Sequence, residues 1–237
     1  MSVAAGFDTS ELERLLAADP AAAHVYLHEA ARAGNGAAQV LFGQALLDGI
    51  GAGCDPGEAL YWFQHAAHQD VAMAMNMLGR CYENGWGTPV DHALAAIWFR
   101  RAADHGLDWG VYNYAHLLAS GRGVPKDRAA AFLWFGRAAS MGHARAMHFL
   151  GQYHENGWET ARDIDKAFAL YRQSAEGGDY RGECSWASVL TQQGRVDEAV
   201  VFLLRAIPKA PPHFLAALAD QLATSPHASL RELLPRT

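Results

Sequence analysis

The sequence has few of the features that would place it outside the ordinary globular proteins. Only three cysteines occur in 237 residues, which argues against a disulfide framework and fits a reducing compartment. No stretch reaches the roughly 18 consecutive apolar residues of a membrane-spanning helix. The first eight residues lack the cationic segment of a secretory signal. We therefore expect a cytoplasmic protein with no membrane span.

Positive charge is also scarce. The chain has 19 Lys and Arg residues against 25 Asp and Glu residues, a formal net charge of -6. A broad basic surface is therefore not expected, and we expect no nucleic-acid partner. Charge is not segregated strongly enough along the sequence to suggest two domains. With 51% hydrophobic residues, and 23 glycines against 9 prolines, the composition favours packed helices separated by glycine turns.

A 36-residue period runs through the middle of the chain. The pair Ala66-Ala67 recurs as Ala102-Ala103 and as Ala138-Ala139. Three further landmarks keep the same spacing: Gly49, Gly85, Gly121 and Gly157; Asp55, Asp91, Asp127 and Asp163; Trp62, Trp98 and Trp134. A period of this length is typical of helical or mixed repeat units that stack and share one continuous core.

Each unit has the pattern of two helices. Asn84-Gly85 is a signal for the end of a first helix, and Asp55 before Pro56 is a signal for the start of a second. Gly79 lies at the centre of a first helix, where glycine costs about 1 kcal/mol relative to alanine. We expect close approach of a neighbouring helix backbone to offset that cost. The fold class predicted is all-α.

The segments from Leu78 to Gly87 and from Ala93 to Gly106 resemble the Sel1-like repeat, a variant of the tetratricopeptide repeat. Residues 121–127 match the same pattern closely. The third unit departs from it at Ala115, and the fourth departs at Glu159, where the second loop glycine is lost. The units with this resemblance are residues 35–70, 71–106, 107–142 and 143–178. The resemblance implies a right-handed α-solenoid of helix hairpins.

The predicted organisation is a single solenoid domain over residues 1–237. Residues 1–34 are expected to form N-terminal capping helices, because an end repeat would otherwise expose its apolar face. Residues 35–178 hold the four repeats, and residues 179–208 look like a plain tetratricopeptide repeat with a shorter loop. Residues 209–237 are expected to form C-terminal capping helices.

Tetratricopeptide geometry implies that the first helices line a concave groove. The residues predicted to point into it are Met73, Asn76, Arg80, Trp109, Tyr112, His116, Arg145, His148, Gln152 and Arg181. Aromatic residues and arginine are enriched in binding hot spots, so this stripe suggests a protein or peptide partner in the groove. A shift of one residue in helix phase would instead place Trp109 or Tyr112 in the core.

The expected function is therefore that of a non-enzymatic scaffold, adaptor or regulator. The resemblance implies such roles, and it also implies roles as immunity or accessory proteins of bacterial toxins and secretion systems. One alternative is a hydrolase that uses His116, His148 and Cys184, although no complete catalytic set is recognisable. Another is a structural oligomer that associates through the apolar segment 214–218 of a terminal helix.

No metal and no cofactor are expected. His24 and His28 have the i, i+4 spacing of metal ligands, and His65 and His68 the i, i+3 spacing, but histidines on solvated helix faces explain both pairs. The glycine-rich segment 49–53 lacks the preceding strand and the following Lys-Ser or Lys-Thr of a phosphate-binding loop. Its glycines fall on the repeat period, which favours turn geometry.

Overall fold

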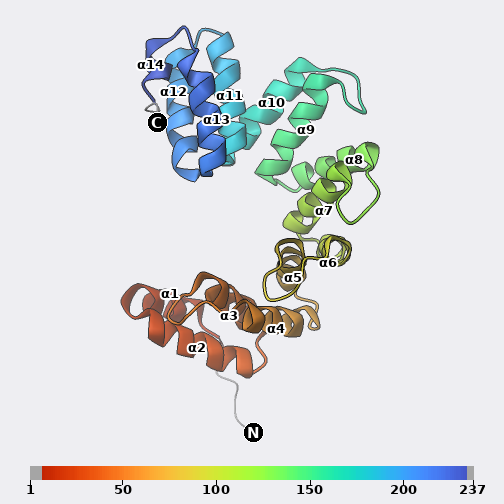
Figure 1. The fold of residues 1–237 in the computed structure, drawn as a ribbon, viewed down its shortest axis with the longest axis vertical. Coiled ribbons are helices and arrows are strands. Elements are labelled where there is room, and N and C mark those ends of the chain that lie inside the picture. The colour runs from red at the N-terminus through yellow and green to blue at the C-terminus, as the bar shows by residue number, and fades with distance from the viewer. Residues whose placement is uncertain (1–6, 234–237) are drawn as a thin grey trace. The chain divides into compact units, whose positions relative to one another are not determined.

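The computed structural model describes residues 7–233, and this range contains fourteen α-helices, one 3-10 turn and no strand (Figure 1). The all-α fold class is therefore confirmed. The helices group into two compact units, Met1–Asp127 (unit 1) and Arg128–Thr237 (unit 2). The prediction of one domain over the whole chain stays a prediction.

Unit 1 consists of helical hairpins whose members pack in chain order, α3 on α4 and α5 on α6. Its helices are α1 (Thr9–Ala18), α2 (Pro20–Arg32), α3 (Gly36–Asp48), α4 (Pro56–Ala67), α5 (Ala72–Asn84), α6 (His92–Asp104) and α7 (Asp108–Ser120).

Unit 2 continues the same pattern, with α8 on α9, α9 on α10 and α11 on α12. Its elements are α8 (Arg128–Ser140), α9 (Ala144–Asn156), α10 (Ile164–Glu176), α11 (Tyr180–Gln192), α12 (Val196–Ala206), the 3-10 turn Ile207–Lys209, α13 (Pro212–Ala223) and α14 (Ala228–Arg231).

The periodic residues end and begin the helices as predicted. The carboxylate of Asp55 accepts a hydrogen bond of 2.9 Å from the Glu58 amide, and Asp91 caps α6 in the same way. The first helices α3, α5, α7 and α9 each end at a left-handed glycine: Gly49, Gly85, Gly121 and Gly157. These caps satisfy backbone groups that a helix leaves without partners at its ends.

The central glycine of a first helix makes room for an aromatic ring, not for a helix backbone as expected. A Cβ atom on Gly79 would lie 2.5 Å from Phe99, and one on Gly43 would lie 2.6 Å from Phe63. Both rings are fully buried. The cost of glycine within the helix is therefore offset by burial of a phenylalanine from the second helix of the same hairpin.

A seven-residue hairpin loop covers the start of the second helix of the preceding hairpin. In unit 1 this contact is so close that a Cβ atom on Gly87 would overlap the carbonyl oxygen of Pro56, the first residue of α4. Gly51 and Gly123 make the equivalent contacts with Pro20 and His92. In unit 2 the matching residue is Glu159, which adopts a positive φ of 55°.

The ends of the chain differ in detail from the expected caps. The first helix is capped by Asp8, whose carboxylate accepts a hydrogen bond from the Ser10 amide. Near the C-terminus, capping helices were expected over residues 209–237. The described part contains α13 and, after it, only the four-residue helix Ala228–Arg231. Residues 234–237 lie outside the described range.

The two units carry different formal charges. The sequence of residues 1–127 has 7 Lys and Arg against 14 Asp and Glu, a net charge of -7. Residues 128–237 have 12 against 11, a net charge of +1. The acidity of the chain therefore lies in unit 1, although charge was not expected to be segregated along the sequence.

Candidate functional site

In unit 1 the predicted binding residues lie on the first helices α5 and α7. Met73 and Trp109 occupy the same repeat position on the two helices, and the side chain of each is 39% exposed. Below them, the Asn113 amide donates a hydrogen bond of 2.8 Å to Asn76, which joins α7 to α5. We call the surface formed by Met73, Arg80, Trp109 and His116 the α5–α7 surface.

Arg80 and His116 of this surface each contact a neighbouring side chain. The guanidinium of Arg80 lies 4.8 Å from the centre of the Trp86 ring, a cation–π arrangement. His116 Nδ1 lies 3.3 Å from the Arg122 guanidinium, which also donates a hydrogen bond of 2.7 Å to Glu83. Since Glu83 belongs to α5 and Arg122 follows α7, this ion pair links adjacent repeats.

In unit 2 the side chains at the corresponding positions contact other residues of the protein. Arg145 pairs with Asp179 at 3.1 Å, and the Asp179 carboxylate also caps α11. His148 Nδ1 lies 3.3 Å from the Ser185 hydroxyl. Burial lowers the pKa of His148 to about 4, so the imidazole is neutral near pH 7. The Arg181 guanidinium stacks 4.5 Å from the centre of the Tyr180 ring.

Three of the predicted groove residues are buried instead of facing solvent. Asn76, Tyr112 and His148 are 3%, 6% and 6% exposed. All three occupy one repeat position, and Asn76 and His148 show that it faces the next first helix: α7 beside α5, and α11 beside α9. Met73 and Trp109 are exposed, while Arg80, His116, Arg145, Gln152 and Arg181 are partly exposed. Partner binding by these residues stays a prediction.

The geometry gives little support to the hydrolase alternative. Burial raises the pKa of the Cys184 thiol to about 12, so that the thiolate needed for attack is scarce. His148, with its pKa lowered to about 4, is a weak base.

The histidine pair with the spacing of metal ligands is engaged elsewhere: His24 and His28 pack on the Phe42 ring. Within residues 7–233, no group of three His, Cys, Asp or Glu side chains is placed to hold a metal ion.

The apolar terminal segment considered for self-association is largely used within unit 2. Phe214 packs edge-on against Tyr180, with ring centres 5.0 Å apart. Leu218 and Leu222 are buried in a cluster with Leu203. End-to-end association stays a prediction. Among the described residues, no helix is long and apolar enough to cross a membrane.

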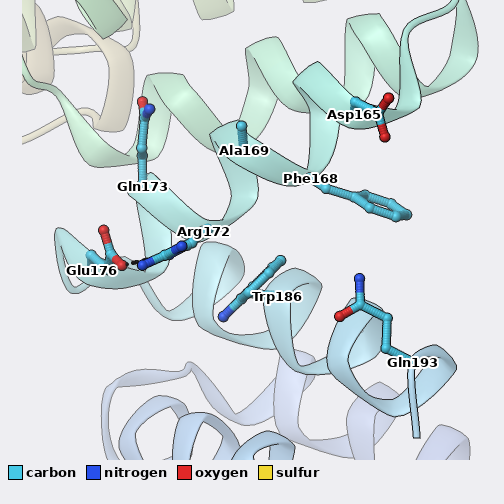
Figure 2. Close-up of a pocket in the computed structure, with 8 residues that line it drawn as sticks. All are labelled: Asp165, Phe168, Ala169, Arg172, Gln173, Glu176, Trp186 and Gln193. Carbon is cyan, nitrogen blue, oxygen red and sulfur yellow. Dashed lines mark hydrogen bonds and ion pairs between the residues drawn. The ribbon is translucent and has the colours of Figure 1, made fainter. Parts of the chain in front are cut away.

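One feature of unit 2 was not predicted from the sequence. An open pocket of about 450 Å³ lies between α10 and α11, with the side chains of Phe168 and Trp186 on its walls (Figure 2). The signal that could have located it is the shorter loop after α11, which comprises only residues 193–195.

Comparison with known proteins identifies the repeat. The family model described as the Sel1 repeat matches residues 13–35, 36–71, 72–107, 110–143 and 144–179. Four of these matches agree with the predicted repeat boundaries within three residues, and the match at 13–35 adds a further repeat where only capping helices were expected. A comparison with curated protein sequences gives no match.

Several solved structures share the fold. A Sel1 repeat protein from Oxalobacter formigenes superposes with a TM-score of 0.78 at 25% identity, covering 94% of this chain and 96% of the other. The protective antigen c5321 of uropathogenic Escherichia coli gives 0.67 at 22% identity, over 89% of this chain and 47% of that longer one. The immunity protein Pa5087 from Pseudomonas aeruginosa gives 0.59 at 17% identity, over 82% and 74%.

Proposed function

The chain belongs to the Sel1 repeat family, whose members are protein-interaction scaffolds, and we propose that it binds a segment of a partner protein on its α5–α7 surface. The observation that carries the proposal is the pairing of Met73 and Trp109 in unit 1. These two large apolar side chains are both exposed and occupy the same repeat position on successive first helices. Tryptophan is among the residues most enriched in binding hot spots, and methionine adapts to varied partners.

The contacts around this pair suggest the chemistry of the partner segment. Arg80 is held over Trp86, and none of its contacts among the described residues is with a carboxylate. Glu83 is already bonded to Arg122. The surface therefore offers an apolar centre with a cationic edge, although unit 1 as a whole is acidic. A segment with an apolar anchor next to a carboxylate would complement it.

A finer part of the proposal is that the partner is a secreted toxin, which the protein would mask as an immunity or accessory protein. Its support is the shared fold with the immunity protein Pa5087, together with the net charge of -6. A cytoplasmic location belongs to the same proposal. The test is to express toxins encoded beside the gene with and without this protein: growth should be restored only when it is present.

The surface itself is tested with matched variants once the partner is known. Met73→Ser combined with Trp109→Ala removes the apolar centre, and we expect at least a tenfold loss of affinity by calorimetry. Ile97→Ala is the control, because Ile97 is 54% exposed but lies on the second helix α6. The control should bind within twofold of the wild type. Equal affinity of all three proteins would overturn the proposal for this surface.

We propose no catalytic role. Burial raises the pKa values of Cys81 and Cys184 to about 12, which leaves both thiols protonated. A hydrolase screen in which turnover disappeared on Cys184→Ser would contradict this part of the proposal.

A further inference from the structure

The pocket between α10 and α11 exists because one loop is short. In the four preceding repeats the two helices of a hairpin are separated by seven residues, as in the segment 157–163, whereas α11 and α12 are separated by the three residues 193–195. Elsewhere this loop covers the start of the preceding second helix, as Gly87 covers Pro56. The equivalent cover over α10 is missing, and Asp165 and Phe168 in its first turns are therefore accessible from outside.

The neighbouring repeat shows one way in which the corresponding place is filled. There the loop residue Trp158 packs against Tyr153, with ring centres 5.8 Å apart. The guanidinium of Arg128, the first residue of α8, lies 5.3 Å from the centre of the Trp158 ring. The start of that second helix thus carries a cation stacked on an aromatic ring. In α10 the residue equivalent to Arg128 is Ile164, so no such cation is supplied.

The pocket between α10 and α11 has aromatic and anionic groups of its own. Phe168 from α10 and Trp186 from α11 extend into the space between the two helices, and the Asp165 carboxylate lies near the start of α10 (Figure 2). The same repeat position holds Phe42, Leu78, Tyr114 and Leu150 in the earlier repeats, so an indole at this position is particular to this repeat. Both rings rest on the cluster of Ala167, Tyr171 and Val189, which fixes their positions.

The charges of the pocket favour a cation. Arg172 is paired with Glu176 along α10, with Nε and Oε1 2.8 Å apart. The Asp165 carboxylate has no hydrogen bond or ion pair with any residue in the part of the chain that the structure describes, and it leaves the lining with a net charge of -1. An ammonium or guanidinium group between two aromatic rings gains cation–π attraction as well as the Coulomb attraction of a carboxylate.

We propose that this pocket receives a cationic side chain, arginine or lysine, presented by a partner protein. The lining runs from Asp165 to Glu176, roughly 16 Å along α10, which gives room for the side chain and for a stretch of its backbone. The pocket is open at its rim, since Asp165, Arg172, Glu176 and Gln193 are all exposed. This shape suits an inserted side chain better than an enclosed metabolite. The site is separate from the α5–α7 surface of unit 1, and it would add a second contact for a partner.

The experiment needs no partner, so its outcome is independent of the proposed function. The ¹⁵N-labelled full chain is titrated with N-acetyl-arginine-methylamide while the indole N–H signal of Trp186 is followed by NMR. We expect a saturable shift with a Kd of about 1–10 mM, which is typical of one exposed contact. The citrulline analogue, which has nearly the same shape without the charge, should cause no saturable shift.

Three variants and one further probe complete the test. Trp186→Leu introduces the residue that two earlier repeats have at this position, Leu78 and Leu150; it assigns the signal and is expected to fold. Asp165→Asn should weaken the arginine probe at least fivefold, while Asp197→Asn, the same change on the exposed face of α12, should leave it unchanged. The absence of a saturable shift, or an equal response to citrulline, would overturn the proposal. Tetramethylammonium that bound ten times more tightly than the arginine probe would assign the pocket to a free small amine and would also overturn it.

Discussion

Unit 1 and unit 2 are built from the same hairpin but bury different polar groups. Among the described residues, the buried polar side chains of unit 1 are the neutral amides Gln39 and Asn76, and each has an amide partner. Unit 2 instead buries groups that titrate: His143, His148, His154, Asp179 and Glu183. The same repeat architecture therefore accommodates either kind of inter-repeat contact. We also expect that the stability of unit 2 alone depends strongly on pH.

The largest expected effect comes from bringing a side chain into the glycine loop of unit 1. Gly87→Ala places a methyl group on the Pro56 carbonyl oxygen and adds a residue with a positive φ of 69°. We expect unfolding of unit 1 to become easier by roughly 4 kcal/mol. Hydrogen exchange of α3–α6, measured by mass spectrometry on the full chain, reports this loss.

The matched control is Gly106→Ala. Gly106 has a similar φ of 82°, but a Cβ atom there would meet nothing within 4 Å. Gly106→Ala should therefore lower the free energy of unfolding by only about 1–2 kcal/mol, which is the contribution of backbone strain alone. Equal losses for the two variants would show that the loop contact contributes little.

Acid should destabilise unit 2 more than unit 1. On folding, burial lowers the pKa of His148 from its ordinary value of 6.5 to about 4, because burial disfavours the charged ring. The unfolded chain therefore binds the proton more readily, and stability is lost as pH falls from about 6.5 to about 4. This residue alone accounts for about 3 kcal/mol of that loss. Burial also lowers the pKa of His154, which adds in the same direction.

The difference between the units can be tested by introducing the amide pair of unit 1 at the equivalent positions of unit 2. His148 and Ser185 stand two repeats after Asn76 and Asn113. His148→Asn with Ser185→Asn should remove most of the pH dependence of α9–α11 exchange and leave α3–α6 unchanged. A steep pH dependence of hydrogen exchange in the double variant would assign the acid sensitivity to other groups.

An intermediate effect is expected at Glu183. Its carboxylate is fully buried in α11 and bonds to Lys209 Nζ at 2.7 and 2.8 Å, with Arg205 Nε at 3.2 Å. Glu183→Gln leaves both cations without their anion, although each can still reach water. We expect a loss of about 2 kcal/mol in urea unfolding of unit 2. Glu198→Gln, at an exposed pair with Arg195, should be nearly neutral.

The smallest expected effect is a gain. Glu159 holds a positive φ of 55° where the other loops have glycine. Glu159→Gly relieves this backbone strain and should stabilise unit 2 by about 1 kcal/mol, measured as a higher Tm. A lower Tm would mean that the Glu159 side chain makes a stabilising contact that exceeds the strain.

Most of the fold could be predicted from the sequence because the helix-capping residues recur with the 36-residue period. Asp55 and Gly85 mark helix ends within a residue, since capping is a local interaction between neighbouring groups. Burial of Asn76 and Tyr112 was not predictable in the same way. One residue along a helix rotates the side chain by about 100°, enough to turn a position from solvent to the adjacent helix. The pocket of unit 2 depends on what a shorter loop leaves uncovered, which needs the packed structure.

The most direct test of the proposed α5–α7 surface is a site-specific cross-link to the partner. A photoreactive amino acid replaces Trp109 on α7 in one variant and Ile97 on α6 in another, and each protein is irradiated in cells of the source organism. The account predicts a partner adduct from position 109, and none from position 97. Adducts from position 97 alone would contradict it, since they would place the partner on the second helices.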